Sequence, residues 1–138
     1  MEIRRDAKLG VDELVDLYTS VGWSTYTDEP ERLATGVENS SIVVTAHDAD
    51  GTLVGLARGL SDDASIFYLQ DILVRPQFHR RGIGRRLLTV CLERYSHVRQ
   101  KVLLTDDDES QQRFYESFGY REPAVLDASL TVYVRFDR

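Results

Sequence analysis

Arginine and glycine are concentrated in one short stretch of the chain, FHRRGIGRRLL, which spans residues 78–88. Glycine lets the backbone turn tightly and leaves its N–H groups open to a ligand. Where such a turn begins a helix, the first N–H groups have no intrahelical acceptor and carry a partial positive charge. Phosphate binds well at such a position. The stretch therefore predicts a phosphate-binding turn, and a solvent-exposed turn or a nucleic-acid patch are the alternatives.

Two familiar phosphate loops do not fit this stretch. A Walker loop is excluded because no Gly-Lys-Ser/Thr follows the glycines, and the dinucleotide-binding fingerprint is excluded because its three-glycine spacing is missing. The net charge of −6 opposes binding to a nucleic acid, and only Phe78 supplies an aromatic ring beside the arginines. We therefore expect no nucleic-acid partner.

The elements that must position this turn follow from hydrophobic periodicity. Apolar residues at helical spacing predict a helix over 11–21 and a second one that begins at Pro30. Three runs of β-branched and aliphatic residues then predict strands, and Asp50-Gly51 predicts a hairpin between the first two. The remaining chain predicts a helix from Gly82, a strand, a helix that Gly119 closes, and a last strand. The strand ranges are 41–47, 53–60, 65–74, 101–105 and 129–136.

This order, roughly ααβββαβαβ, predicts an α/β (α+β) fold with a mixed, mostly antiparallel central sheet that helices flank. No internal linker is visible, so residues 1–138 are expected to form one domain. The single cysteine, Cys91, and the absence of an apolar run of ~18 residues or of an apolar N-terminal signal core favour a cytoplasmic protein without a membrane partner. The three histidines share no ligand spacing, so no metal site is expected.

Two segments together resemble the GNAT superfamily of acetyl-CoA-dependent N-acetyltransferases: ILVRPQFHRRGIGRRLL and, downstream, RFYESFGYRE. The family signature, Gln/Arg-x-x-Gly-x-Gly/Ala, follows a strand that ends in Val-x-Pro. Gly82 and Gly84 occupy both glycine positions, and His79 stands at the first position, where glutamine or arginine is usual. The second segment fits the family pattern Phe-Tyr-x-x-x-Gly-Phe, with tyrosine as its last aromatic residue. GWSTY and ARGLSDD are loosely similar to a bacterial and plant subgroup related to arylalkylamine (serotonin-type) acetyltransferases.

The resemblance implies a set of contacts with acetyl-CoA. Backbone groups of Leu73 and Val74 are expected to bind the pantetheine arm and the thioester carbonyl, and residues 79–85 are expected to hold the pyrophosphate. Asp108 stands where the family commonly has an asparagine that contacts the cofactor, although its TDDDE segment also predicts a negative N-cap for the next helix. The implied cofactor-binding residues are Leu73, Val74, His79, Arg80, Arg81, Gly82, Ile83, Gly84, Arg85 and Asp108.

The resemblance also implies catalytic roles for two residues. Tyr115 is expected to protonate the CoA sulfur, because a phenol with a pKa near ~10 is a donor at neutral pH; the alternative is an aromatic core residue. Asp71 is expected to accept the proton of the attacking ammonium, directly or through water, and the alternative is a strand-end charge that faces solvent. Trp23, Tyr26 and Tyr68 either line an amine pocket or pack in the core.

The function implied is the transfer of an acetyl group from acetyl-CoA to a primary amine, by direct attack in a ternary complex. The acceptor is a small amine or an amino terminus. The alternative is a catalytically idle acyl-CoA-binding regulatory protein that keeps the glycines and arginines but lacks the acid and the base. The sequence leaves the oligomeric state open, a homodimer included.

Overall fold

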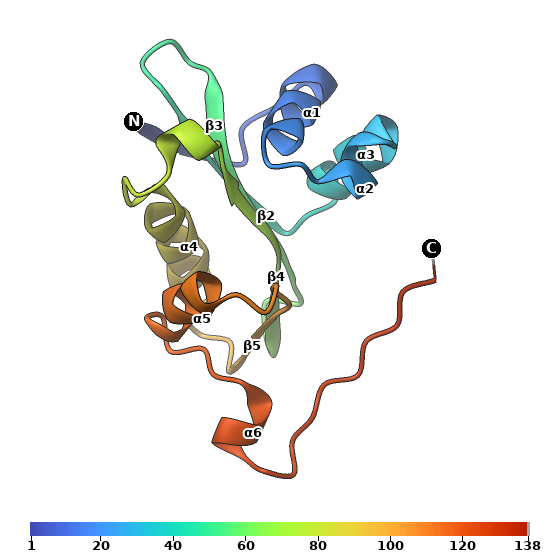
Figure 1. The fold of residues 1–138 in the computed structure, drawn as a ribbon, viewed down its shortest axis with the longest axis vertical. Coiled ribbons are helices and arrows are strands. Elements are labelled where there is room, and N and C mark those ends of the chain that lie inside the picture. The colour runs from blue at the N-terminus through green and yellow to red at the C-terminus, as the bar shows by residue number, and fades with distance from the viewer. Residues whose placement is uncertain (138) are drawn as a thin grey trace. The chain divides into compact units, whose positions relative to one another are not determined.

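The computed structural model describes residues 1–137, and its helices and strands follow the predicted periodicity over most of this range (Figure 1). The Pro30 helix and the Gly82 helix begin as expected, since Pro30 is in the first turn and Gly82 is the N-cap. The elements are β1 (Glu2–Arg5), α1 (Val11–Ser20), α2 (Ser24–Thr27), α3 (Pro30–Glu38), β2 (Ile42–His47), β3 (Leu53–Ser61), β4 (Ile66–Val74), the 3-10 helix η1 (Pro76–Phe78), α4 (Ile83–Arg94), β5 (Gln100–Leu103), α5 (Glu109–Glu116) and α6 (Pro123–Leu126).

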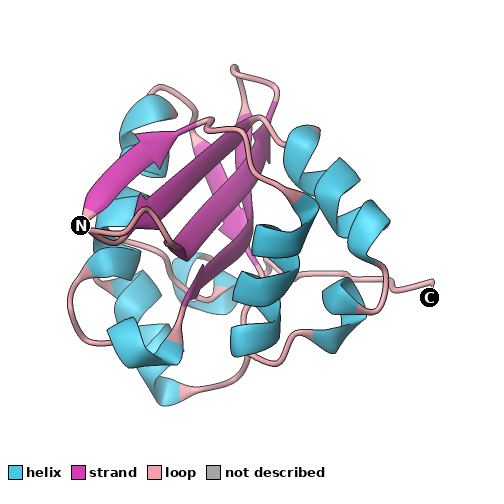
Figure 2. Ribbon diagram, turned by 90° about the horizontal axis from the view of Figure 1, so that it is seen from above, coloured by secondary structure: helices cyan, strands magenta, loops and turns pink. Residues whose placement is uncertain are grey.

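The strands form one five-stranded sheet in the order β1-β2-β3-β4-β5. Neighbouring strands are antiparallel except β4 and β5, which are parallel. Helices lie on both sides of this sheet (Figure 2). The predicted mixed and mostly antiparallel α/β fold is therefore confirmed. The described chain forms two compact units, Met1–Leu104 with the whole sheet and a second unit from Thr105 onward.

The predicted element order is incomplete at both ends of the chain. Strand β1 was not predicted, because three of the four residues in EIRR are charged and the segment therefore lacks an apolar alternation. The short helices α2 and α6 were not predicted either. The last predicted strand, over 129–136, is wrong: this segment forms neither helix nor strand in the structure. An alternating pattern becomes a strand only where an edge supplies hydrogen-bond partners.

One face of the sheet packs against α1 and α3. The shared core consists of side chains that are almost fully removed from water, and burying each aliphatic one contributes roughly 1.5–3 kcal/mol. Tyr18 belongs to this core, yet its hydroxyl reaches a carboxylate in the sheet. The core residues are Leu14, Leu17, Tyr18, Leu33, Val37, Val43, Leu53, Leu56 and Leu73.

The opposite face packs against α4, and two glycines of β3 leave space for side chains of α4 and β4 on this face. A Cβ at Gly55 would lie 3.3 Å from the Leu87 side chain, and one at Gly59 would lie 2.4 Å from the Phe67 ring. The Phe67 ring stacks on Tyr95, with centroids 4.9 Å apart. Cys91 is fully buried on the same helix.

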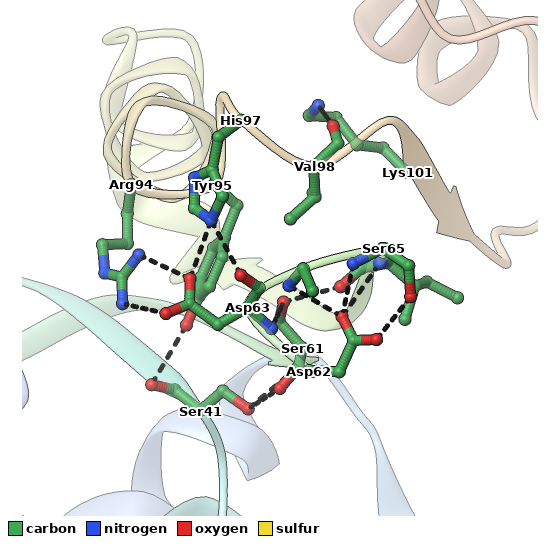
Figure 3. Close-up of polar contacts among 12 residues, drawn as sticks. Ser41, Ser61, Asp62, Asp63, Ser65, Arg94, Tyr95, His97, Val98 and Lys101 are labelled. Atoms are coloured by element: carbon green, nitrogen blue, oxygen red, sulfur yellow. Dashed lines mark hydrogen bonds and ion pairs between the residues drawn. The ribbon is translucent and has the colours of Figure 1, made fainter.

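The turn between β3 and β4 is tied to the end of α4 by polar contacts (Figure 3). The Asp62 carboxylate accepts hydrogen bonds from the backbone N–H groups of Ala64, Ser65 and Ile66. The neighbouring Asp63 accepts from the Arg94 guanidinium at 3.1 Å and pairs with the His97 imidazole at 2.8 Å. These contacts fix the start of β4 relative to α4.

A membrane-spanning helix is not found among residues 1–137, since none of their helices has both the length and the apolar character that spanning requires.

Candidate functional site

Strand β4 loses its partner on one side before it ends. Its parallel ladder with β5 stops at the pair Leu69 and Leu103, whereas its antiparallel ladder with β3 continues to the pair Val74 and Gly55. The last five residues of β4, 70–74, therefore have a ladder on one side only within the described sheet. Backbone N–H and C=O groups along such an open edge have no ladder partner, so they can bind an extended ligand.

Hydrogen-bond alternation decides which residues face this open edge. The Arg75 N–H donates to the Val54 carbonyl at 2.9 Å. Because backbone groups alternate in direction along a strand, Leu73 directs its backbone groups toward β3, while Ile72 and Val74 direct theirs to the open edge. Of the two residues expected to bind pantetheine, Val74 faces the open edge. Leu73 lies in the ladder with β3, and its side chain is buried in the core.

The end of β4 is anchored by two side chains. The Arg75 guanidinium donates through Nε to the Leu53 carbonyl at 2.8 Å and pairs with Asp16 of α1 at 2.5 Å. The chain then turns through η1, and the His79 imidazole Nε2 lies 2.7 Å from the Val74 carbonyl oxygen. His79 therefore contacts the open edge directly and holds the following turn against it.

The predicted phosphate-binding turn has the backbone conformation that such a turn needs. Arg80 and Gly82 both adopt left-handed conformations, with φ of 63° and 75°. Gly82 is the N-cap of α4, and its carbonyl accepts the first helical hydrogen bond from the Arg86 N–H. The glycine is required for its φ rather than for space, since nothing lies within 4 Å of a Cβ built there.

The surroundings of this turn are polar and cationic. The exposed arginines lie on both sides of Gly82, and the Arg81 guanidinium stacks over the Phe78 ring at 5.1 Å. Ile83 is buried and fixes the first turn of α4 in the core. The N–H groups of that first turn, the left-handed residues and the arginines together suit a phosphate ligand. The exposed arginines are Arg80, Arg81, Arg85 and Arg86.

Asp71 reaches the α1 side of the sheet because of an irregularity in β4. The ladder with β3 pairs Arg58 with Asp71 and then Gly59 with Leu69, so Gln70 is an extra residue. A bulge of this kind changes the face on which the following side chains lie. Leu69 is on the α4 side, whereas Asp71 points toward α1 and α2. The carboxylate does not face solvent, because its side chain is only 4% exposed.

Three side chains donate hydrogen bonds to the Asp71 carboxylate. Oδ2 accepts from the Arg58 Nε at 2.7 Å and from the Tyr18 hydroxyl at 2.9 Å, and Oδ1 accepts from the Tyr26 hydroxyl at 2.8 Å. Burial and the Asp71 charge raise the pKa of Tyr18 and of Tyr26, so both phenols remain protonated donors. Burial alone would lower the pKa of Arg58, but the charge of Asp71 offsets this effect and the pKa is raised.

Tyr26 is the half-buried member of this network. Its hydroxyl also accepts a hydrogen bond from the Gln70 Nε2 at 2.9 Å, and its ring lies edge-on to Tyr18 with centroids 5.1 Å apart. Trp23 packs beside both rings. Two of the three aromatic residues considered for an amine pocket therefore lie together with Asp71.

Arg58 was not predicted from the sequence as a residue of this site. The signal was present, since a single arginine in the apolar strand LVGLARGL implies a buried counter-charge. The space for its guanidinium comes from Gly36 of α3, where a Cβ would lie 3.3 Å from an Arg58 terminal nitrogen.

The second compact unit holds the two remaining residues of the predicted site. Asp108 is the N-cap of α5, and its carboxylate accepts hydrogen bonds from the Ser110 hydroxyl and from the Gln111 and Ser110 N–H groups, which lower its pKa. The predicted N-cap is therefore confirmed. Tyr115 is buried, and desolvation raises its pKa to about 12, opposed by a hydrogen bond with Thr105. A phenol of this kind holds its proton throughout the neutral range.

The structure thus brings most of the predicted residues together within the first unit. The end of β4, η1 and the start of α4 hold residues 71–85 in one continuous segment. Asp108 and Tyr115 are on α5 of the second unit. No group of histidine, cysteine, aspartate and glutamate among residues 1–137 is arranged to hold a metal ion.

The chain is similar to known proteins over most of its length. The family model described as "Acetyltransferase (GNAT) domain" matches residues 15–125. A curated relative, the uncharacterized N-acetyltransferase ycf52 of Pyropia yezoensis, is 26% identical over 111 residues, which is 78% of this chain. The chain spans only 63% of that relative's length.

Solved structures share the fold. A GNAT family acetyltransferase of Streptococcus pneumoniae TIGR4 is 27% identical, with a TM-score of 0.81 and 97% coverage of both chains. AAC(6')-Iy, solved in complex with the bisubstrate analog CoA-S-monomethyl-acetylneamine, is 17% identical with a TM-score of 0.71. That match covers 99% of this chain and 98% of the other and shows similarity of fold alone.

Proposed function

The chain belongs to the GNAT acetyltransferase family, and from this premise we propose that it transfers the acetyl group of acetyl-CoA to a primary amine. One observation carries the proposal: the open edge of β4 leads directly, through η1, into the left-handed turn at the start of α4. An extended amide chain that ends in a pyrophosphate needs both features in that order.

The contacts with acetyl-CoA are divided between backbone and side chains. We propose that the backbone groups of Val74 bind the pantetheine arm and the thioester carbonyl, with Ile72 as a second residue on the same edge. Leu73 supports this edge through its ladder with β3. The turn at 79–85 binds the pyrophosphate, with His79 and the exposed arginines as side-chain donors. Asp108 contributes by capping α5.

The reaction needs no enzyme nucleophile. The amine nitrogen attacks the thioester carbonyl carbon, a C–N bond forms, and the C–S bond breaks. N–H groups on the open edge stabilise the negative charge that develops on the carbonyl oxygen. Tyr115 donates its proton to the departing sulfur, a role that its raised pKa supports because the phenol stays protonated.

The proton of the amine is proposed to reach Asp71 through Tyr26. Each oxygen of the carboxylate already accepts a hydrogen bond, and the side chain is almost fully buried. The Tyr26 hydroxyl is half-buried, donates to Oδ1 and accepts from Gln70 Nε2, so an amine that takes the place of Gln70 would give it a proton as it passes its own to Asp71. Trp23 and Tyr26 would pack against the acceptor.

The acceptor is proposed to be a small amine or an amino terminus. AAC(6')-Iy is described as an aminoglycoside N-acetyltransferase, which is an example of an amine acceptor on the same fold. We also propose that both compact units act as one acetyltransferase domain, since the family match from 15 to 125 runs across both.

Calorimetric titration with acetyl-CoA tests the cofactor assignment, with CoA and ATP as comparison ligands. We expect binding of acetyl-CoA and CoA and much weaker binding of ATP. Gly82→Asp should abolish binding, because it adds a carboxylate to the turn and strains its backbone. Gly22→Asp is the matched control, since Gly22 has a similar φ of 77° with nothing within 4 Å of its Cβ. Equal loss of binding in both variants would contradict the assignment.

Release of free CoA thiol in the presence of small amines then tests turnover. Acetylated product with at least one amine is the expected result. If the protein binds acetyl-CoA but acetylates no primary amine, it is an acyl-CoA-binding protein and not an acetyltransferase.

A further inference from the structure

Gln70 is an exposed side chain that hydrogen-bonds to the Tyr26 hydroxyl next to Asp71. The Gln70 Nε2 donates to that hydroxyl at 2.9 Å, and the hydroxyl donates to the Asp71 Oδ1 at 2.8 Å. Tyr26 is half-buried, and the Asp71 side chain is almost fully buried. The three groups therefore form a path of hydrogen bonds from solvent to the buried carboxylate, and Gln70 is at the outer end of this path.

The bulge in β4 places Gln70 and Asp71 on the same side of the sheet. In a regular strand, adjacent side chains point to opposite faces. Gln70 is the extra residue in the ladder with β3, and both it and Asp71 hydrogen-bond to the hydroxyl of Tyr26 on α2. The bulge thus supplies two adjacent polar side chains to the α2 side, where a regular strand would supply one.

Both lone pairs of the Tyr26 hydroxyl oxygen are directed at nitrogen donors. A hydroxyl has one proton to donate and two lone pairs that accept. Its proton goes to Asp71, Gln70 donates at 2.9 Å, and a terminal nitrogen of Arg58 lies 3.4 Å away, which is long for a hydrogen bond. Arg58 is buried and held by Asp71. The donor that an ammonium group from solvent can displace is therefore Gln70.

The end of a glutamine side chain carries both a donor and an acceptor. Its NH2 group donates and its carbonyl oxygen accepts. Rotation about the last side-chain bond is soft, so a half-turn exchanges the two groups at little cost. In the free protein, Nε2 faces the Tyr26 hydroxyl. Once an incoming group has displaced Nε2, the half-turn lets Oε1 accept a hydrogen bond from that group.

We propose that Gln70 is a specificity-determining residue of the acceptor site: its carboxamide releases the Tyr26 hydroxyl to the acceptor ammonium and then accepts a second N–H bond of that ammonium through Oε1. This inference rests on the proposed acetyl transfer. The ammonium of a primary amine has three N–H bonds and satisfies both contacts, whereas a hydroxyl has a single proton and satisfies one. Gln70 therefore favours amines over alcohols of the same carbon skeleton.

Binding of benzylamine to the full chain with saturating CoA tests this role without turnover, because CoA carries no acetyl group. Benzylamine is a primary amine that is protonated at neutral pH, and benzyl alcohol has the same skeleton with one donor. The unchanged protein should bind benzylamine at least about tenfold more tightly than benzyl alcohol. The side-chain amide NMR signal of Gln70 should shift as benzylamine saturates the site.

Two substitutions separate the donor and acceptor roles of the carboxamide. Q70A removes both roles and should weaken benzylamine binding about tenfold, as expected for loss of a hydrogen bond to a charged group. Q70E keeps the acceptor but cannot donate to Tyr26, and it should bind benzylamine at least as tightly as the unchanged protein. Because Gln70 is exposed, neither variant is expected to unfold.

Gln100, an exposed glutamine of β5, supplies the matched controls. Q100A removes a carboxamide of the same kind, and Q100E adds the same charge as Q70E at a different place on the sheet. Both controls should leave the affinity for benzylamine within about twofold.

Several results would overturn the proposal. If Q70E binds benzylamine as weakly as Q70A does, Gln70 acts only by holding Tyr26 through Nε2. Unchanged affinity in Q70A, or no saturable binding of benzylamine to the unchanged protein, also contradicts the proposal.

Failure of the proposed acetyl transfer gives a different result. In that case no CoA thiol is released from acetyl-CoA with any amine, and the role of Gln70 in acceptor choice falls with the function, whatever the benzylamine affinities. If thiol release is instead equal in the unchanged protein, Q70A and Q100A, the acetyl transfer stands and the role of Gln70 is refuted.

Discussion

Arg58 and Asp71 lie opposite each other on β3 and β4, and the guanidinium Nε donates to the carboxylate Oδ2 across 2.7 Å. Both side chains are less than a tenth exposed. Removing one member of a buried ion pair leaves an uncompensated charge, which costs ~3–5 kcal/mol, whereas replacing both members costs far less. The pair therefore makes it possible to separate the structural from the catalytic role of Asp71.

Asp71→Asn should lower the free energy of unfolding by ~3–5 kcal/mol in urea denaturation. The double variant Asp71→Asn, Arg58→Met should recover a large part of this loss, because no buried cation remains. Turnover should stay abolished in the double variant if Asp71 accepts the proton. If the double variant recovers turnover as well as stability, the role of Asp71 is structural and not catalytic. Glu2→Gln, which breaks an exposed pair with Arg4, serves as the control and should change stability little.

Tyr115→Phe should lower kcat by ~100-fold or more while leaving the affinity for acetyl-CoA within about twofold, as expected for loss of a general acid. Because the folded protein raises the pKa of Tyr115 to about 12, the phenol keeps its proton as pH rises through its ordinary value near 10. The rate of the unchanged enzyme should therefore show no loss from Tyr115 ionisation at pH 10. Tyr133→Phe, at an exposed tyrosine, is the control. An alkaline decline centred near pH 10 that Tyr115→Phe removes would contradict the assignment.

Hydrogen exchange can test the open edge of β4 without any knowledge of the acceptor. The amides of Ile72 and Val74 should exchange at least about tenfold faster than that of Leu73, which donates within the ladder to β3. Saturating acetyl-CoA should slow Val74 and leave Leu73 unchanged. Equal protection of all three amides in the free protein would mean that the edge is closed.

Gly59→Ala should destabilise the α4 side of the sheet by about 1–3 kcal/mol, the usual cost of overpacking. The new Cβ would lie 2.4 Å from the Phe67 ring and 2.8 Å from the Tyr68 carbonyl oxygen. The double variant Gly59→Ala, Phe67→Leu should be more stable than the sum of the single changes predicts, because the smaller side chain relieves one of the two clashes. If the stability changes of the two single variants simply add in thermal denaturation, the Phe67 ring is not what makes a larger residue unfavourable at position 59.

Much of the first unit was predictable from local signals. Pro30 and Gly82 mark helix starts, and Asp50-Gly51 marks the hairpin, because each of these residues suits one backbone conformation. The turn at 79–85 was predictable in the same way, from its glycines. These features depend on the chain itself rather than on distant partners.

Long-range features were not predictable in this way. The extra residue Gln70 decides which face Asp71 occupies, and no local pattern in SIFYLQDILV distinguishes a bulged strand from a regular one. The space that Gly36 leaves for Arg58 depends on α3 packing against β3. The pattern over 129–136 is that of a strand, but whether it becomes one depends on an edge that local sequence does not specify.

Cys91 gives the chain a useful property for its own study. It is the single cysteine, it is fully buried, and desolvation raises the pKa of its thiol to about 12. Thiolate is the reactive form, so at neutral pH thiol-specific dyes should react with released CoA and not with Cys91 of the folded protein. The same thiol becomes reactive when α4 detaches from the sheet. One dye therefore reports turnover in the native protein and, without substrate, the rate at which the native protein opens.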